Sequence, residues 1–172
     1  NPIRRRRLHR RVGEGLRERV QATSRATETA SGSPGHAELA FHFIEAGAHE
    51  LALEHSLAAA EEAERVFALE RSLARYGNAL ESALALGDGE QAARIEMRTA
   101  LTCLKNGRAL DAARHGEAAL SGDLSPEDRD RAALTAAAGY LIVGDPRGRP
   151  LATEIVERGD GVAPQLRAEA LL

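Results

Sequence analysis

Residues 69–87 read LERSLARYGNALESALALG, and their pattern of apolar side chains indicates the fold class. The large apolar side chains recur at spacings of three and four residues, at Leu69, Leu73, Tyr76, Leu80 and Leu84. That spacing places them on one face of an α-helix. Gly87 can end this helix, and Asp88 can cap the next one. The stretch therefore predicts an amphipathic helix followed closely by another.

Apolar stripes with the same period continue along the chain in both directions. They fall within residues 39–44, 52–67, 93–104, 109–120, 134–141 and 151–156. Between the stripes stand residues that end or begin helices, namely Gly47, Asn106-Gly107, Gly122, Ser125-Pro126 and Gly144-Asp145-Pro146. No segment alternates with the period of two that a strand requires. We therefore predict an all-α fold without a sheet.

The N-terminal segment differs from the rest in charge and in periodicity. Asn1-Pro2 suits the start of a helix, because Asn can cap it and Pro fits its first position. Apolar residues then recur every four positions on one drifting face, at Leu8, Val12, Leu16 and Val20. We predict a basic amphipathic helix over residues 1–22, linking to an upstream domain. Residues 23–35 then form a flexible loop, and residues 36–172 form helical repeats that are truncated at the C-terminus.

Small residues recur at fixed distances from the turns. The clearest sets are Gly47 with Ala52 and Ala59, and Gly107 with Ala112 and Ala119. Small side chains at these places let paired helices approach closely, and large residues such as Phe43 and Tyr140 fill the space between hairpins. The pattern resembles the tetratricopeptide repeat, although it has no Trp and its spacing is irregular. The resemblance implies hairpins stacked in an irregular right-handed superhelix.

A narrower resemblance rests on the first sixty residues. Residues 5–16 read RRRLHRRVGEGL, residues 37–47 read AELAFHFIEAG, and ELALEH follows at residues 50–55. This order is similar to the segment that follows the nucleotidase and winged-helix modules in large LuxR-type regulators and related STAND signalling ATPases. Helical repeats in that family act as a sensor and interaction arm, and they restrain the ATPase until an inducer or partner binds. The ATPase and DNA-binding motifs of the family have no counterpart in these residues.

Composition limits the classes of function. The chain of 172 residues carries a net charge of −3, which gives no overall attraction to nucleic acid. A single cysteine, Cys103, excludes an internal disulfide, and we expect it to be a buried small apolar residue. No apolar run is long enough for a membrane span, and no signal peptide is visible. These features predict a cytoplasmic protein.

The residue types that carry chemistry do not form a catalytic motif. His49 and His55 are six residues apart, as are His36 and His42. Two histidines that bind one metal ion from a helix are four apart, whereas a step of six turns them to different sides. The glycine-rich stretches at Gly87 and Gly144 lack the Gly-Lys-Ser/Thr of a phosphate loop. We therefore expect no catalytic residues, no metal and no cofactor.

Arginines are concentrated near the N-terminus, at residues 4–7, 10 and 11. They could contact a phosphate or a nucleic acid, but no aromatic side chains accompany them for stacking on bases. Glu14 and Glu18 lie at helical spacings from this cluster. We favour a solvated face, or one that docks on an acidic neighbouring domain, and do not expect direct nucleic-acid binding.

A partner-binding set follows from the repeat register. Arg94 and Arg131 fall at equivalent positions relative to Gly107 and Gly144, and Met97 and Leu134 follow one turn later. Two arginines above an apolar step would suit an acidic peptide or domain on a concave face, although both could simply cover solvent-facing helix.

The sequence thus predicts a non-catalytic repeat arm of a bacterial STAND-type, LuxR-like transcriptional regulator. The expected partners are a protein or small inducer on the concave face and neighbouring domains of the same chain, without a membrane. One alternative is an independent tetratricopeptide adaptor that scaffolds protein complexes. The other is an enzyme or nucleic-acid protein that uses the arginine helix.

Overall fold

The computed structural model describes residues 1–26 and 35–157, and within them every regular element is an α-helix. The chain divides into two compact units, residues 1–87 and residues 88–172. The predicted all-α class is confirmed for the described residues. The unit boundary lies at Gly87 and Asp88, which the sequence marks only as one turn among several.

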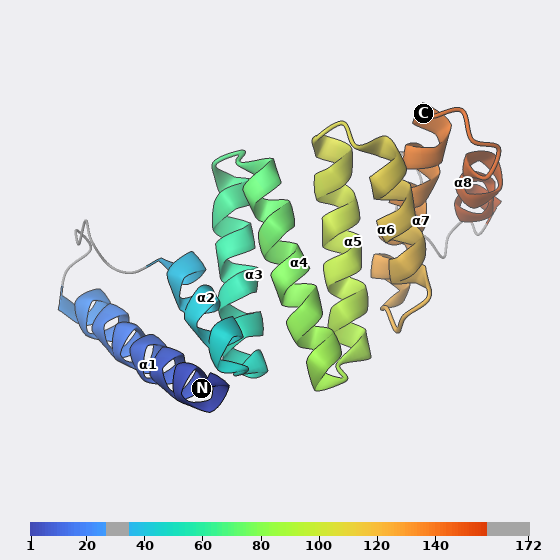
Figure 1. Cartoon of the computed structure of the whole chain (residues 1–172). Coiled ribbons are helices and arrows are strands. Elements are labelled where there is room, and N and C mark those ends of the chain that lie inside the picture. Colours follow the sequence, from blue (N-terminus) through green and yellow to red (C-terminus); the bar gives the residue numbers. More distant parts are fainter. Residues whose placement is uncertain (27–34, 158–172) are drawn as a thin grey trace. The chain divides into compact units, whose positions relative to one another are not determined.

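The first unit contains four helices, which Figure 1 shows in blue to green: α1 (Pro2–Ala26), α2 (His36–Ala46), α3 (His49–Arg65) and α4 (Leu69–Leu86). Each helix packs against the next one along the chain. One apolar cluster of the unit contains Leu39, Phe43 and Ala52, and Leu16 and Val20 of α1 pack against it. Helix α1 thus reaches this apolar cluster through Leu16 and Val20.

The second unit contains α5 (Gly89–Lys105), α6 (Ala109–Leu120), α7 (Pro126–Ile142) and α8 (Gly148–Glu157). Helix α5 packs on α6 and also on α7, and α8 packs on α7. Apolar clusters lie between these helices. One contains Ala93, Met97, Ala119, Leu124 and Ala132, and another contains Ala133 and Ile155.

Most helix ends lie where the turn residues predict them. Gly47, Gly87, Gly107 and Gly144 all adopt left-handed backbone, with φ between 68° and 72°. At three of these glycines, the residue that follows donates its backbone N–H to the carbonyl oxygen of the residue five positions before it. The hydrogen bonds run from Ala48 to Phe43, from Arg108 to Cys103 and from Asp145 to Tyr140, each at 2.9 Å. This is the Schellman cap, which satisfies carbonyls that the helix end leaves free. Asp88 and Ser125 cap the following helices through Gln91 N–H (3.0 Å) and Asp128 N–H (3.2 Å).

The small residues of the repeat pattern lie at close helix contacts. Ala52, Ala112 and Ala119 are fully buried, as are the predicted space-fillers Phe43 and Tyr140. Gly139 of α7 is packed so tightly that a Cβ there would collide with the carbonyl oxygen of Ala109. Helices α6 and α7 therefore approach through backbone and methyl groups.

Three local expectations need correction. Helix α1 continues through Ala26, so residues 23–26 are helical and not loop; residues 27–34 lie outside the described part. Alanine and arginine favour continuing a helix that has already nucleated. Val66 and Phe67, predicted within the apolar stripe of the helix over residues 52–67, follow the end of α3 and are exposed.

The third correction concerns the apolar face of α1. Leu8 and Val12 are exposed, and only Leu16 and Val20 join the core. A spacing of four residues drifts by about 40° per step, so the stripe rotates away from α2 toward the N-terminus. Gly13 takes the contact instead, because a Cβ at that position would lie 2.9 Å from Phe43 Cε1.

Candidate partner-binding surfaces

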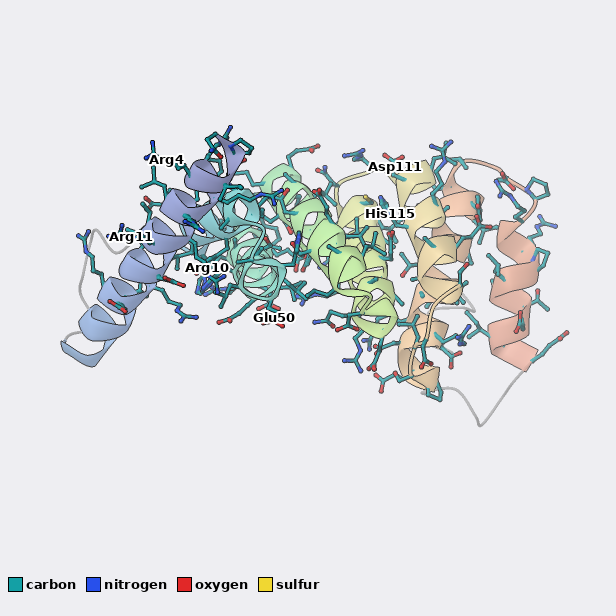
Figure 2. All side chains as sticks on the ribbon, turned by 60° about the horizontal axis from the view of Figure 1, so that its bottom comes forward. Arg4, Arg10, Arg11, Glu50, Asp111 and His115 are labelled. Carbon is teal, nitrogen blue, oxygen red and sulfur yellow. The ribbon has the colours of Figure 1, made fainter. Side chains whose placement is uncertain are left out.

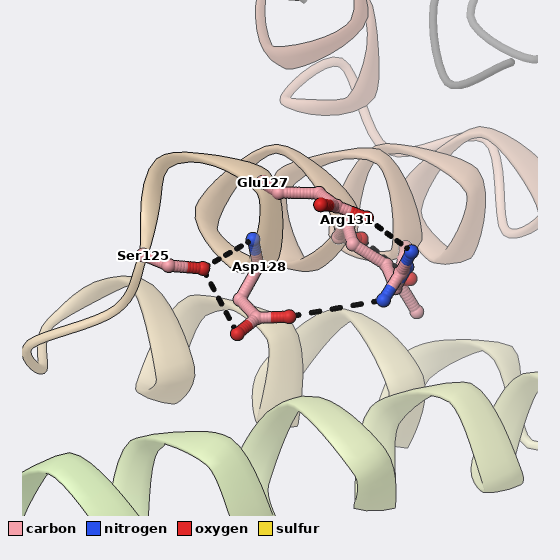
Figure 3. A network of polar contacts seen from close by, with 5 residues as sticks. Ser125, Glu127, Asp128 and Arg131 are labelled. Atoms are coloured by element: carbon pink, nitrogen blue, oxygen red, sulfur yellow. Dashed lines mark hydrogen bonds and ion pairs between the residues drawn. The ribbon is translucent and has the colours of Figure 1, made fainter. Parts of the chain in front are cut away.

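Arg94 and Arg131, the predicted cationic pair, each bond to acids on their own helix. Arg94 pairs with Glu90 at 2.8 Å on α5. Arg131 pairs with Glu127 at 3.1 Å and lies 3.7 Å from Asp128, in the network that also contains the Ser125 cap (Figure 3). A partner carboxylate would therefore have to compete with local acids for both guanidinium groups.

The two apolar members of the predicted set belong to different clusters. Met97 is 7% exposed and lies in the cluster of Ala93 and Ala132. Leu134 packs against the cluster of Ala133 and Ile155. Met97 thus serves as core and offers a ligand little surface, while partner binding at these four residues stays a prediction.

The arginine cluster of α1 divides into paired and outward-facing side chains. Arg10 bonds Glu14 on the same helix at 3.2 Å, and Arg5 bonds Glu45 of α2. Arg4 and Arg11 lie on the side of α1 away from α2 in Figure 2. The cluster therefore has one anchor on α2 and an exposed basic side.

Four histidines form two imidazole pairs, which the sequence did not predict. His42 Nδ1 lies 3.0 Å from His9 Nδ1 of α1, and His36 Nδ1 lies 3.0 Å from His55 Nδ1 of α3. The six-residue step between His36 and His42 does turn them to different sides of α2, as expected. Each pair joins helices distant in sequence, which is why no local spacing revealed it.

His55 occupies the most enclosed position of the four. It is 4% exposed, and its ring stacks on Phe43 with the centroids 5.5 Å apart. Its Nε2 has no hydrogen-bond partner among the described residues. A bare lone pair there costs less than a buried N–H, so we place the proton on Nδ1, which donates to His36.

Burial lowers the pKa of His55 below its ordinary value of 6.5. The charges of His36 and Arg17 act in the same direction, and that of Glu54 acts against them. On the other edge of the pair, His36 Nε2 lies 3.9 Å from Glu62. Burial therefore disfavours the charged form of the enclosed imidazole.

The turn between α3 and α4 is the main surface feature that sequence reasoning missed. Phe67 adopts φ 55° and is the one non-glycine residue with positive φ among the described residues. It caps α3 as the glycines cap other helices, with Ala68 N–H bonding Ala63 O at 2.8 Å. Phe67 is 86% exposed and Val66 is 66% exposed. The sequence did contain a signal for a turn here, because position 67 continues the spacing of 20 residues that separates Gly87 from Gly107 and places Gly47 a further 20 residues before it.

A pocket of about 330 Å³ opens beside this turn. Its apolar lining is Ala37 of α2 with Ala59, Ala63 and Val66 of the α3 segment. Its charged lining is Glu62 together with Arg71 and Arg75 of α4. The turn therefore combines exposed apolar side chains with a mostly cationic hollow.

Three further features of the described residues concern metal-binding clusters, free cysteines and membrane-spanning helices. Within residues 1–26 and 35–157, no group of three or more His, Cys, Asp or Glu could hold a metal ion. Cys103 is buried, as expected. Every helix within residues 1–26 and 35–157 is too short or too polar to span a bilayer.

The chain was compared with known protein families, curated proteins and solved structures, and none of them matches it.

Proposed function

We propose that this chain is a non-catalytic helical repeat module that binds a protein or a small ligand. The observation that carries the proposal is the recurrence of one left-handed cap at residues 47, 67, 87 and 107. Helices of similar length joined by the same tight turn are the building units of repeat proteins. Such proteins present extended surfaces made by many helices, and those surfaces commonly bind partners.

The tetratricopeptide-like superhelix is part of the proposal. Close packing at Gly139 and Ala112 supports it, because small residues at hairpin contacts are what such stacks need. The repeat length differs from the family pattern. Twenty residues per helix and turn give 40 per hairpin, against about 34 in a tetratricopeptide. We therefore propose a longer hairpin than the consensus.

We further propose that the module is the sensor arm of a STAND-type, LuxR-like regulator in the cytoplasm. The resemblance within residues 5–16 and 37–47 motivates this step. Both segments are helical, and they pack together through Gly13 and Phe43. The Arg4 and Arg11 side of α1 suits an acidic neighbouring domain.

The coding sequence on either side of residues 1–172 is the first test. A phosphate-loop motif upstream and a helix-turn-helix downstream are expected. ATP turnover of the full-length protein should then rise when residues 36–157 are deleted, because the arm restrains the ATPase. An open reading frame without a nucleotide-binding module would contradict the proposal of a regulator arm and would favour an independent adaptor protein.

The exposed arginines of α1 favour one further candidate, a nucleic-acid contact. It requires the chain to bind duplex DNA with an affinity that falls steeply with salt. An Arg4→Glu/Arg11→Glu variant should then lose that binding. We expect no salt-dependent binding from the intact chain, since its net charge is −3.

A further inference from the structure

Phe67 occupies a left-handed backbone position, with φ 55°, of the kind that favours glycine. Gly47, Gly87, Gly107 and Gly144 stand at the other left-handed caps. A side chain with a Cβ is strained at positive φ, and a bulky aromatic residue is rarely found there. A strained residue of this kind points to a function beyond folding.

Packing within the chain does not account for the aromatic ring either. Phe67 is 86% exposed, so its ring contributes little to the core of its unit. Val66 beside it is 66% exposed. Adjacent exposed apolar side chains, rimmed by charged ones, mark sites of protein interaction.

The pocket beside the turn supplies the charge that defines a partner. Arg71 and Arg75 are one helical turn apart on α4, and both line it. No carboxylate of the described residues forms an ion pair with either guanidinium, in contrast to Arg94 and Arg131. Glu62 lies on the same rim, 3.9 Å from His36 Nε2. The rim is therefore cationic on balance, above a floor of alanines.

We propose that the α3–α4 turn binds an acidic protein segment through an apolar anchor. The partner's apolar side chain contacts Phe67 and Val66 and enters the alanine-lined pocket. Its carboxylates pair with Arg71 and Arg75, whose guanidinium N–H groups can donate to them in bidentate geometry. This inference rests on the proposed binding function and names the partner class and the surface.

The test begins with a phage-displayed library of random twelve-residue peptides, selected on the intact chain. The counter-selection target is the Phe67→Gly/Arg71→Glu/Arg75→Glu variant. We expect enriched peptides to share at least two acidic residues and one large apolar residue. Failure to enrich any peptide over the counter-target, or enrichment of neutral or basic peptides, overturns the proposal.

One enriched peptide is then labelled with a fluorophore, and its affinity for the chain is measured by fluorescence anisotropy. Phe67→Gly should weaken binding at least tenfold while leaving the melting temperature unchanged or higher. Arg71→Glu/Arg75→Glu should weaken it at least as much, and Arg71→Lys/Arg75→Lys should restore part of the affinity. The matched control is Arg114→Glu/Arg149→Glu, which makes the same change in charge at two exposed arginines of α6 and α8 and should leave the affinity unaltered.

Equal losses in the matched control and in the Arg71→Glu/Arg75→Glu variant would show a nonspecific charge effect and overturn the proposal. A Phe67→Gly variant that binds as tightly as the native chain would do the same. None of these measurements involves ATP or a neighbouring domain. If peptide binding fails while deletion of the arm still activates the full-length ATPase, only the α3–α4 surface is rejected.

Discussion

At the scale of single residues, Gly139 shows how closely α6 and α7 approach. A Cβ at this position would collide with Ala109 O and lie 2.8 Å from Ala113 N. We predict that Gly139→Ala lowers the free energy of unfolding by about 1–3 kcal/mol, because a packed backbone has to move. Urea denaturation of the purified chain would measure the loss.

The matched control is Gly77→Ala on α4, where a Cβ would meet no atom within 4 Å. Because alanine is the better helix former, this change should stabilise the chain by about 0.5–1 kcal/mol. Equal effects at the two glycines would mean that α6 and α7 are not in close contact.

Phe67 permits the opposite kind of prediction, in which a substitution that removes a large side chain stabilises the fold. Relief of the left-handed strain should outweigh the greater freedom that glycine has when unfolded. We expect Phe67→Gly to raise the free energy of unfolding by about 1 kcal/mol, again measured in urea. Gly107→Ala is the converse test. That site has φ 72° with open space around it, so a loss there would come from the backbone alone.

At the scale of helices, the turn residues made most of the architecture predictable. Gly47, Gly107 and Gly144 ended helices where the apolar stripes stopped, and Ser125-Pro126 began one. These signals are local, since a cap depends on a few neighbouring residues. Phe67 was missed because its side chain gives the opposite signal to its backbone: an aromatic residue at helical spacing suggests core, although here it caps the helix end.

Contacts between helices were much harder to predict. The drift of the Leu8 to Val20 stripe was visible, but which half would face α2 depends on Phe43 filling the space at Gly13. The imidazole pairs depend on the same register, since His9 and His55 come from helices on either side of α2. Met97 and Leu134 were placed by repeat equivalence, which does not specify the cluster that each side chain joins.

The enclosed imidazole makes the α2–α3 contact sensitive to acid. His55 has a lowered pKa in the folded state, so below pH 6.5 the unfolded chain binds its proton first. The stabilisation is complete above pH 6.5 and is lost as the pH falls through the folded pKa. This group alone gives a slope of at most about 1.4 kcal/mol per pH unit. We predict a melting temperature that declines from pH 7 to pH 5.

His55→Gln should flatten that decline, whatever it does to stability at pH 7.5. His49→Gln is the matched control, because His49 is only half-buried at the start of α3, away from both imidazole pairs. A decline that stays as steep in the His55 variant as in the His49 variant would assign the acid sensitivity to the carboxylates.

At the scale of the whole molecule, each unit contains the parts that a folded domain needs. The first has the Leu39–Phe43–Ala52 cluster, and the second has the clusters around Met97 and Ile155. Asp88 caps the first helix of the second unit within that unit. The sequence did not reveal this division, because Gly87-Asp88 carries the same signals as the turns inside the units.

We therefore predict that residues 88–172 fold without residues 1–87. The separate fragment should give a helical far-ultraviolet spectrum and melt in one cooperative transition, since its apolar clusters and caps are internal to it. Gly139→Ala should lower its stability as much as it does in the whole chain, because α6 and α7 belong to the same unit and distant residues contribute independently. Circular dichroism at 222 nm during heating measures both. A fragment that loses helix gradually, or that is indifferent to Gly139→Ala, would mean that the second unit needs the first in order to pack.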